Sequence, residues 1–228
     1  MTVTVGFLVF PGIQLLDLAG PYEIFSALPD SEIHLFWKAR GPLACSAGML
    51  LQPTTPLDDG PLVDVLCIPG GVGINLLLLD KEVQAWVQRQ ASTAQFVTSV
   101  CTGALLLGAA GLLAGRRATT HWRYHDLLAE FGAIPVKERV VRDGNLITGG
   151  GVTAGVDFGL VVVAALRGQA AAEEIQLALE YAPEPPFQAG RPGDAPKDIV
   201  EVVLRRTETL HAERERVTGQ WTTRSPAE

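Results

Sequence analysis

Short runs of mostly apolar residues recur along this chain, and stretches with helical spacing lie between them. The runs at 3–10, 63–68 and 96–100 carry few polar residues, whereas a strand with one face in water alternates apolar and polar side chains. The three apolar runs are therefore expected to be strands that are buried on both faces. They predict an α/β fold with a mostly parallel sheet and helices on both faces. Helices are predicted at 18–28, 81–92, 102–113, 122–131, 152–167, 171–181 and 198–217.

The composition fits one large domain. Of the 228 residues, 47% are hydrophobic and 19% are charged, which is typical of a well-packed globular protein. We expect residues 1–197 to form a single α/β domain. Residues 198–228 are expected to form a C-terminal helix and tail. This helix has apolar residues on one face and packs on the same domain or on a dimer partner.

Charge, hydropathy and cysteine content limit the partners and the compartment. The formal net charge of −7 argues against nucleic acid as the main partner. No run of about 18 apolar residues is present, so no membrane span is expected, and the N-terminus is typical of a strand rather than of a signal peptide. The three cysteines, Cys45, Cys67 and Cys101, match neither a disulfide framework nor a metal site. A reducing cytoplasm is therefore the expected location.

Residues suited to chemistry follow three of the predicted strands. Asp17 comes shortly after the first strand, Gly70 and Gly71 follow the run at 63–68, and Cys101 follows the run at 96–100. In parallel α/β sheets the active site lies beyond the carboxyl ends of the strands. These residues are therefore the candidates for an active site.

Cys101 stands where a strand turns directly into a helix. Such a turn exposes the residue, and the helix N-terminus favours the thiolate. Gly103 leaves room for a substrate next to the thiol. The alternative is a structural cysteine, because free cysteines are among the most buried residues. That alternative is our interpretation of Cys67, which lies inside an apolar strand. Cys101 we interpret as a nucleophile.

Asp17 is interpreted as a carboxyl group that exchanges a proton with Cys101. Its leucine neighbours would raise its pKa if the group is buried, and helix N-capping is the alternative role. The N–H groups of Gly71 and Thr102 could together form an oxyanion hole, although glycines after a strand often only make a turn.

Two further motifs are weaker. His121 and His125 are possible bases for the thiol, but histidines often have a structural partner. The glycine-rich turn at 148–155 lacks the lysine of a P-loop and the spacing of a dinucleotide fingerprint, which disfavours nucleotide binding there.

Four segments resemble the ThiJ/PfpI superfamily. They are LDLAGPYEIF (16–25), CIPGG (67–71), SVCTGALLLGAAGLLAGRRATTHW (99–122) and ERVVRDGNLITGGGVTAGVDF (138–158). Within that superfamily, the chain to about residue 190 is similar to the bacterial isocyanide hydratases. Aspartate at position 17 distinguishes them, because most of the superfamily has glutamate there.

The resemblance implies a flavodoxin-like three-layer sandwich, a homodimer and a hydro-lyase that adds water to an isocyanide, giving an N-substituted formamide. It implies that Cys101 forms a covalent thioimidate, that Asp17 is the general acid and base, and that Thr102 supplies a nearby hydroxyl. This chemistry needs no metal or organic cofactor. The substrate is expected to be surrounded by Gly70, Gly71, Trp122, Gly150 and Val152.

Two other functions stay open from the sequence. One is another thiol enzyme of the same superfamily, acting on glyoxal-type aldehydes or on amides. The other is a redox sensor in which Cys101 is oxidised. Thr102 stands where hydrolase relatives have histidine, which disfavours a protease. The single charged helix after residue 197 is too short for the paired helix-turn-helix module of related regulators.

Overall fold

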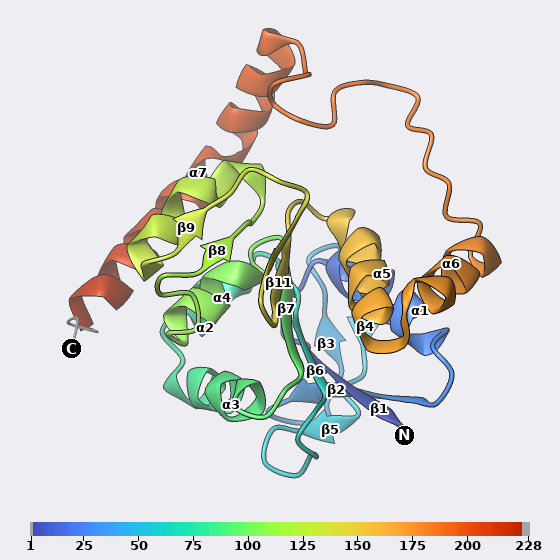
Figure 1. The fold of residues 1–228 in the computed structure, drawn as a ribbon. Helices are drawn as coiled ribbons and strands as arrows, with labels where there is room; N and C mark the ends of the chain where they lie inside the picture. The colour runs from blue at the N-terminus through green and yellow to red at the C-terminus, as the bar shows by residue number, and fades with distance from the viewer. Residues whose placement is uncertain (1, 225–228) are drawn as a thin grey trace.

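A computed structural model of the protein describes residues 2–224 and has a seven-stranded sheet as its middle layer (Figure 1). The strands are β1 (Val3–Leu8), β2 (Ser31–Trp37), β5 (Thr55–Pro56), β6 (Val65–Ile68), β7 (Phe96–Val100), β10 (Val140–Asp143) and β11 (Leu146–Gly149). Their order is β10-β11-β7-β6-β1-β2-β5. Only the β10–β11 pair at one edge is antiparallel. Two small sheets pair β3 (Leu43–Ala44) with β4 (Leu50–Leu51) and β8 (Arg117–Ala118) with β9 (Ile134–Pro135).

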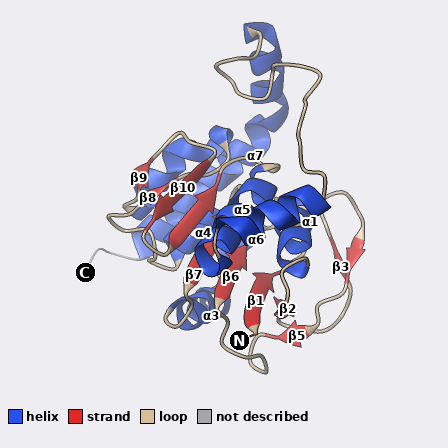
Figure 2. Cartoon of the chain, turned by 45° about the vertical axis from the view of Figure 1, so that its right-hand side comes forward, coloured by secondary structure: helices blue, strands red, loops and turns tan. Residues whose placement is uncertain are grey.

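Helices cover both faces of the sheet, with α1 (Leu15–Ser26) and α5 (Ala154–Arg167) on one side and α3 (Lys81–Ala91) and α4 (Gly103–Ala109) on the other (Figures 1 and 2). The predicted α/β class with a mostly parallel sheet is confirmed. The remaining helices are α2 (Ile74–Leu77), the 3-10 helix η1 (Trp122–Phe131), α6 (Gln169–Ala178) and α7 (Lys197–Arg224).

The structure differs from the predicted elements where local geometry overrides periodicity. Helix α4 ends at Ala109 rather than at residue 113, because Gly111 adopts a left-handed conformation with φ of 78°. The segment 122–131 is a 3-10 helix with a kink at Tyr124. The elements β5, β8, β9 and α2 have four residues or fewer, too few to show a hydrophobic period.

The three central strands carry the site. Strands β6 and β7 are buried along their whole length, and β1 is buried except at one residue. This explains their nearly unbroken apolar sequences. They are neighbours in the order β7-β6-β1 and run parallel. Their carboxyl ends therefore bring Cys101, Gly70 and the loop into α1 to one edge of the sheet.

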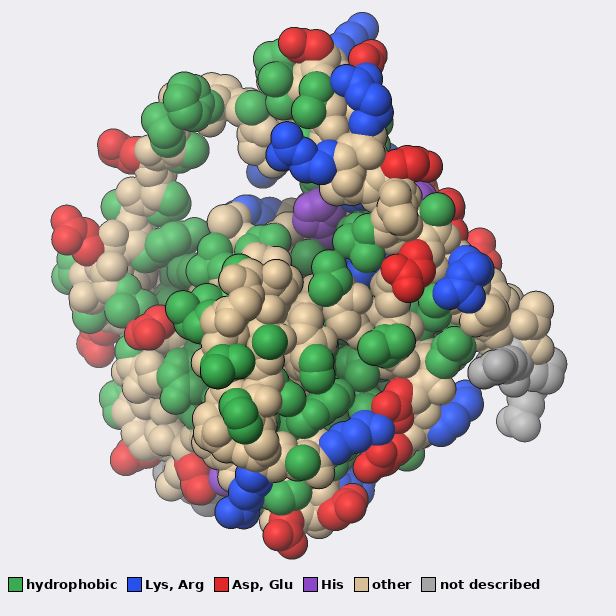
Figure 3. Space-filling view, turned by 180° about the vertical axis from the view of Figure 1, so that it is seen from behind, with side chains coloured by type: hydrophobic (Ala, Val, Ile, Leu, Met, Phe, Trp, Pro, Cys, Tyr) green, Lys and Arg blue, Asp and Glu red, His purple; other side chains and the backbone are tan. Residues whose placement is uncertain are grey.

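The chain after α6 leaves the domain and returns to it. Residues 182–194 are exposed throughout, and the linker stands off from the body of the molecule with a gap beneath it (Figure 3). Helix α7 then packs against η1 and α2. It begins one residue before the predicted start and continues beyond the predicted end, whereas the last tail residues, 225–228, lie outside the described residues. No helix in the described part of the chain is both long and apolar enough to cross a membrane.

The close approach of Gly103 to β6 generates the first prediction. A Cβ atom at position 103 would lie 2.0 Å from the carbonyl oxygen of Ile68, so Gly103→Ala must displace backbone. We expect it to lower the free energy of unfolding by about 2–3 kcal/mol, measured by urea denaturation. Gly219→Ala is the control, because a Cβ there meets nothing within 4 Å. It should leave stability unchanged or raise it by up to about 1 kcal/mol. Equal effects of the two substitutions would contradict this account.

Candidate active site

Cys101 occupies a strained turn between β7 and α4. Its φ is 54°, a conformation that costs a non-glycine residue on the order of 1–3 kcal/mol. The N–H of Cys101 donates to the carbonyls of Gly149 and Gly150, at 3.1 and 2.8 Å. Its own carbonyl accepts from Thr120 Oγ1 at 2.6 Å. The end of β11 and the segment after β8 therefore hold the strained residue in place.

Asp17 lies in the first turn of α1 and is completely buried. Its Oδ2 accepts a hydrogen bond from the N–H of Gly70 at 2.9 Å, and the Cys101 thiol is its side-chain hydrogen-bond partner. Its Oδ1 is buried and receives no hydrogen bond from a nitrogen or oxygen atom of the described residues. The alternative role of helix N-cap is wrong, because the N-cap position is Gln14.

Gly70 permits this contact because it has no side chain. A Cβ at position 70 would lie 2.6 Å from the backbone nitrogen of Thr102 and 2.8 Å from Asp17 Oδ2. Any other residue would separate the carboxyl group from the turn that carries Cys101. Gly70, which the sequence places at the substrate, therefore also allows Asp17 to pack against the turn that carries Cys101.

Burial dominates the electrostatics of the pair. It raises the pKa of Asp17 from 3.8 to about 7, although the Gly70 N–H and the Cys101 thiol both act to lower it. Burial and the charge of Asp17 raise the pKa of Cys101 well above its usual value. The N–H of Thr102 and the charge of Arg214 act in the opposite direction. The N–H of Thr102 at the helix N-terminus favours the thiolate, as expected from the sequence, but desolvation by burial is the larger effect and keeps the pKa of Cys101 high.

The hydroxyl of Thr102 is bound to Gly71 rather than to Asp17. Thr102 Oγ1 accepts from the Gly71 N–H at 3.0 Å and lies 3.4 Å from the Gly71 carbonyl oxygen. The Gly71 N–H is thereby occupied, so it does not form the oxyanion hole suggested by the sequence. The N–H of Thr102 instead acts on the Cys101 sulfur.

The other predicted substrate-binding residues are less closely tied to the pair. Gly150 is buried and its carbonyl binds the Cys101 N–H. Val152 is partly buried against the core. Trp122 begins η1, and its ring centroid lies 5.8 Å from that of His121. Neither Val152 nor Trp122 has a hydrogen bond to Cys101 or Asp17 in the described structure, so their place at the substrate stays a prediction.

Neither histidine forms a hydrogen-bonded dyad with Cys101. The Nδ1 atom of His121 accepts from the N–H of Arg123 at 3.3 Å. Burial, together with the charge of Arg214, lowers the pKa of His121 to about 4, so its ring is neutral at pH 7. His125 is buried, and its Nε2 has no hydrogen-bond partner among the described residues.

Sequence reasoning missed three residues beside the pair, namely Asn75, Tyr124 and Arg214. Arg214 Nε donates to Asn75 Oδ1 at 2.7 Å, and Arg214 Nη2 donates to the Gly71 carbonyl at 3.0 Å. The Arg214 guanidinium lies 4.2 Å from the Tyr124 ring centroid. A sequence signal was available, because Arg214 falls in line with the apolar residues of its helix, at the spacing of Leu210, Val217 and Trp221.

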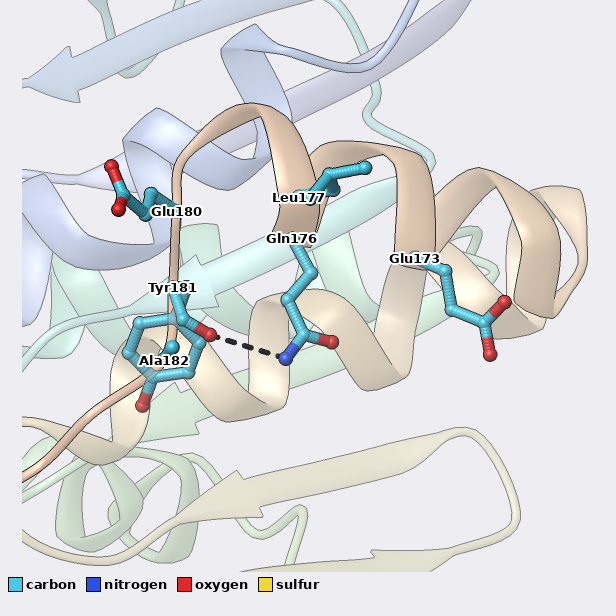
Figure 4. Close-up of a pocket in the computed structure, with 6 residues that line it drawn as sticks. All are labelled: Glu173, Gln176, Leu177, Glu180, Tyr181 and Ala182. Atoms are coloured by element: carbon cyan, nitrogen blue, oxygen red, sulfur yellow. Dashed lines mark hydrogen bonds between the residues drawn. The ribbon is translucent and has the colours of Figure 1, made fainter.

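No group of three or more His, Cys, Asp or Glu residues that could hold a metal ion occurs in residues 2–224. A shallow surface pocket lies at the end of α6 (Figure 4). Its lining residues are Glu173, Gln176, Leu177, Glu180, Tyr181 and Ala182, and it includes none of the predicted site residues.

The fold and the site together define a class: a flavodoxin-like α/β protein with a buried cysteine–carboxyl pair at a strand–helix turn. Comparison with known proteins agrees, because the model of the DJ-1/PfpI family matches residues 3–165. The chain belongs to this family.

Individual proteins match more of the chain than the family model does. A Pseudomonas putida protein named isonitrile hydratase is 54% identical over 206 residues, which are 90% of each chain. The crystal structure of a ThiJ/PfpI family protein from Pseudomonas syringae superposes with a TM-score of 0.93 at 42% identity, over 96% of this chain and 91% of that one. Drosophila melanogaster DJ-1β shares the fold at 21% identity and a TM-score of 0.72. All of that chain is covered by 80% of this one.

The buried carboxyl group generates a prediction for stability. The pKa of Asp17 is about 7 in the folded protein against 3.8 as its ordinary value, so the folded state binds more protons between these values. The free energy of unfolding should fall as pH rises from 4 to 7, by on the order of 1.4 kcal/mol per pKa unit at most. Asp17→Asn should remove that fall.

Urea denaturation of both proteins at pH 5 and pH 8 measures the effect. The variant should gain stability relative to the natural protein at pH 8. A difference between the two that is the same at both pH values would contradict the raised pKa.

Proposed function

We propose that this protein is an isocyanide (isonitrile) hydratase that converts R–N≡C and water into the formamide R–NH–CHO. The observation that carries the proposal is the buried Cys101–Asp17 pair, in which a thiol faces a carboxyl group with a pKa of about 7. The 54% identity to the Pseudomonas putida isonitrile hydratase supports the same conclusion.

The first step uses the proton that the pair shares. Asp17 takes the proton of the Cys101 thiol, and the thiolate attacks the terminal carbon of the isocyanide. Asp17 then donates the proton to that carbon. A C–S bond and a C–H bond form, the N≡C bond loses one bond order, and the product is the thioimidate R–N=CH–S–Cys101.

The second step hydrolyses this thioimidate. Asp17, now ionised, takes a proton from water as the oxygen adds to the carbon, and it passes that proton to the nitrogen. The C–S bond then breaks as the C=O bond forms, and the remaining hydroxyl proton returns to Asp17. The formamide leaves, and Cys101 is a thiolate beside a protonated Asp17. A carboxyl group with a pKa of about 7 suits this alternation at neutral pH, because neither of its protonation states is strongly favoured. No step requires a cofactor.

Other residues have supporting parts in this mechanism. The N–H of Gly70 keeps Asp17 oriented through its bond to Oδ2. Thr102 keeps the Gly71 loop against the turn that carries the nucleophile. Gly150 binds the Cys101 backbone, and Trp122 and Val152 form part of the wall around the R group.

Turnover of an aryl isocyanide tests the proposal. We expect saturable formation of the formamide, which chromatography measures. Cys101→Ala should reduce turnover to background, and Asp17→Asn should lower it about 10²–10⁴-fold. Cys45→Ala is the matched control: it also removes a buried free thiol, but one in the hairpin region, and it should retain activity.

Absence of turnover by the reduced natural protein would contradict the hydratase function. Consumption of glyoxal-type aldehydes would then favour the second kind of thiol enzyme. Inertness toward both, with ready oxidation of Cys101 by peroxide, would favour a redox sensor. All three cysteines are free, which fits a reducing cytoplasm.

We also propose that the protein is a homodimer. Large apolar side chains are exposed on three segments, with Leu76 at 77%, Leu50 at 67% and Leu16 at 43% exposure. These segments lie side by side, because the loop before α1 is hydrogen-bonded both to the β3–β4 hairpin and to the chain between β6 and α2. An apolar patch of this kind is typical of a protein–protein interface.

Light scattering of the purified protein checks this. The natural chain should have twice the mass of one chain, and Leu76→Glu should shift it to monomer. Leu177→Glu is the control, because Leu177 is 81% exposed on α6, which is none of these three segments. A natural protein of single-chain mass at micromolar concentration would exclude the dimer.

A further inference from the structure

Helix α7 places an arginine inside the domain. Arg214 is only 1% exposed, whereas the neighbouring Arg216 is exposed. Its guanidinium donates to Asn75 and to the Gly71 carbonyl and lies over the Tyr124 ring. Arg214 therefore reaches the loop that follows β6, the same loop that binds Asp17 through Gly70.

All of these partners are neutral. Among residues 2–224, no carboxylate lies within ion-pair distance of Arg214. A guanidinium keeps its proton in proteins, and burying a charge without a counter-charge is costly. A buried cation with neutral partners gains most from a negative charge that forms nearby.

The charged and titratable groups around Arg214 show where that negative charge forms. The charge of Arg214 acts on Cys101, in the turn before α4, and on His121 and Tyr124 at the start of η1. Asp17 of α1 faces the Cys101 thiol. Glu213, the neighbour of Arg214 on α7, also acts on Arg214, but the Glu213 side chain is exposed to solvent. His121 is neutral, and burial raises the pKa of Tyr124, so at neutral pH the anion arises on either Asp17 or Cys101.

We propose that Arg214 is a positioning residue that completes the active site from α7. Through its bond to the Gly71 carbonyl it fixes the loop whose Gly70 N–H holds Asp17. Through its charge it stabilises the Cys101 thiolate that exists when Asp17 holds the shared proton. The proposal rests on the proposed function for its catalytic consequence, whereas its effect on the thiol does not depend on the substrate.

The anchoring of the helix supports this assignment. Trp221 Nε1 donates to the carbonyl of Ala109 at the end of α4, at 3.1 Å, and its ring lies 4.7 Å from that of Phe131. His211 stacks on Tyr124 at 5.6 Å. These contacts hold the C-terminal half of α7 against η1 and α4, with Arg214 between them. The helix lies beyond residues 3–165, which the family model matches, so the site extends outside that region.

The test measures the rate at which iodoacetamide alkylates Cys101 between pH 6 and 10, with mass spectrometry of the Cys101 peptide. Arg214→Gln keeps a donor for the Gly71 carbonyl but removes the charge, and Arg214→Lys keeps the charge. We expect Arg214→Gln to move the pH profile upward by at least one unit, with an approximately tenfold slower rate at pH 8. Arg214→Lys should keep a profile close to that of the natural protein. Arg216→Gln, on the same helix, should leave it unchanged.

Identical profiles for Arg214→Gln and Arg214→Lys would overturn the role of the charge. If Arg214→Gln does not fold, as judged by circular dichroism, Arg214→Lys decides. A profile shifted upward by one unit in this folded, charged variant would also overturn the proposal.

Isocyanide turnover by the same proteins is a separate readout. If the natural chain shows no turnover but the alkylation profiles are as expected, the hydratase function is rejected and the role of Arg214 stays intact.

Discussion

The hydrogen bond from the Gly70 N–H to the Asp17 carboxyl group joins the elements on which the site depends. Asp17 belongs to α1, Gly70 follows β6, and a Cβ at position 70 would collide with the turn that carries Cys101. The bond therefore requires three chain segments, far apart in sequence, to meet without a side chain between them. The parallel order β7-β6-β1 makes this possible, because it ends all three strands at the same edge.

Electrostatics at this edge result from competition between burial and a few specific contacts. Burial opposes charge on both Asp17 and Cys101. The charge of Asp17 makes ionisation of Cys101 harder still, whereas the hydrogen bond from the Cys101 thiol makes ionisation of Asp17 easier. The pair consequently holds one proton over a wide pH range and can move it between oxygen and sulfur. A fixed positive charge from α7 favours the thiolate arrangement without adding a second titrating group, since arginine stays protonated.

The central part of the fold could be predicted from the sequence because its strands are buried on both faces and are therefore apolar at nearly every position. The strands β1, β6 and β7 and the residues at their ends follow from that pattern, and so does the expectation that Asp17 and Cys101 meet. The bond between Thr102 and Gly71 could not be predicted, because it depends on the rotamer of one side chain in a tight loop. The partners of Arg214 could not be predicted either. Its spacing with the apolar residues of its helix indicates that it points inward, but it is 113 residues after Cys101 in the chain, and only tertiary packing brings it to the loop after β6.

The exposed linker at 182–194 makes the last helix a tethered component of the site. An element joined by a chain of this kind occupies its docking surface at an effective concentration set by the length and stiffness of the tether. Exposed linkers of this kind are also preferred sites of proteolytic cleavage. A cut there would leave every residue of the sheet-borne pair in place while turning an intramolecular association into a bimolecular one. The site is therefore complete only in the intact chain. Dilution of a protein cut in this linker would separate Cys101 and Asp17 from Arg214.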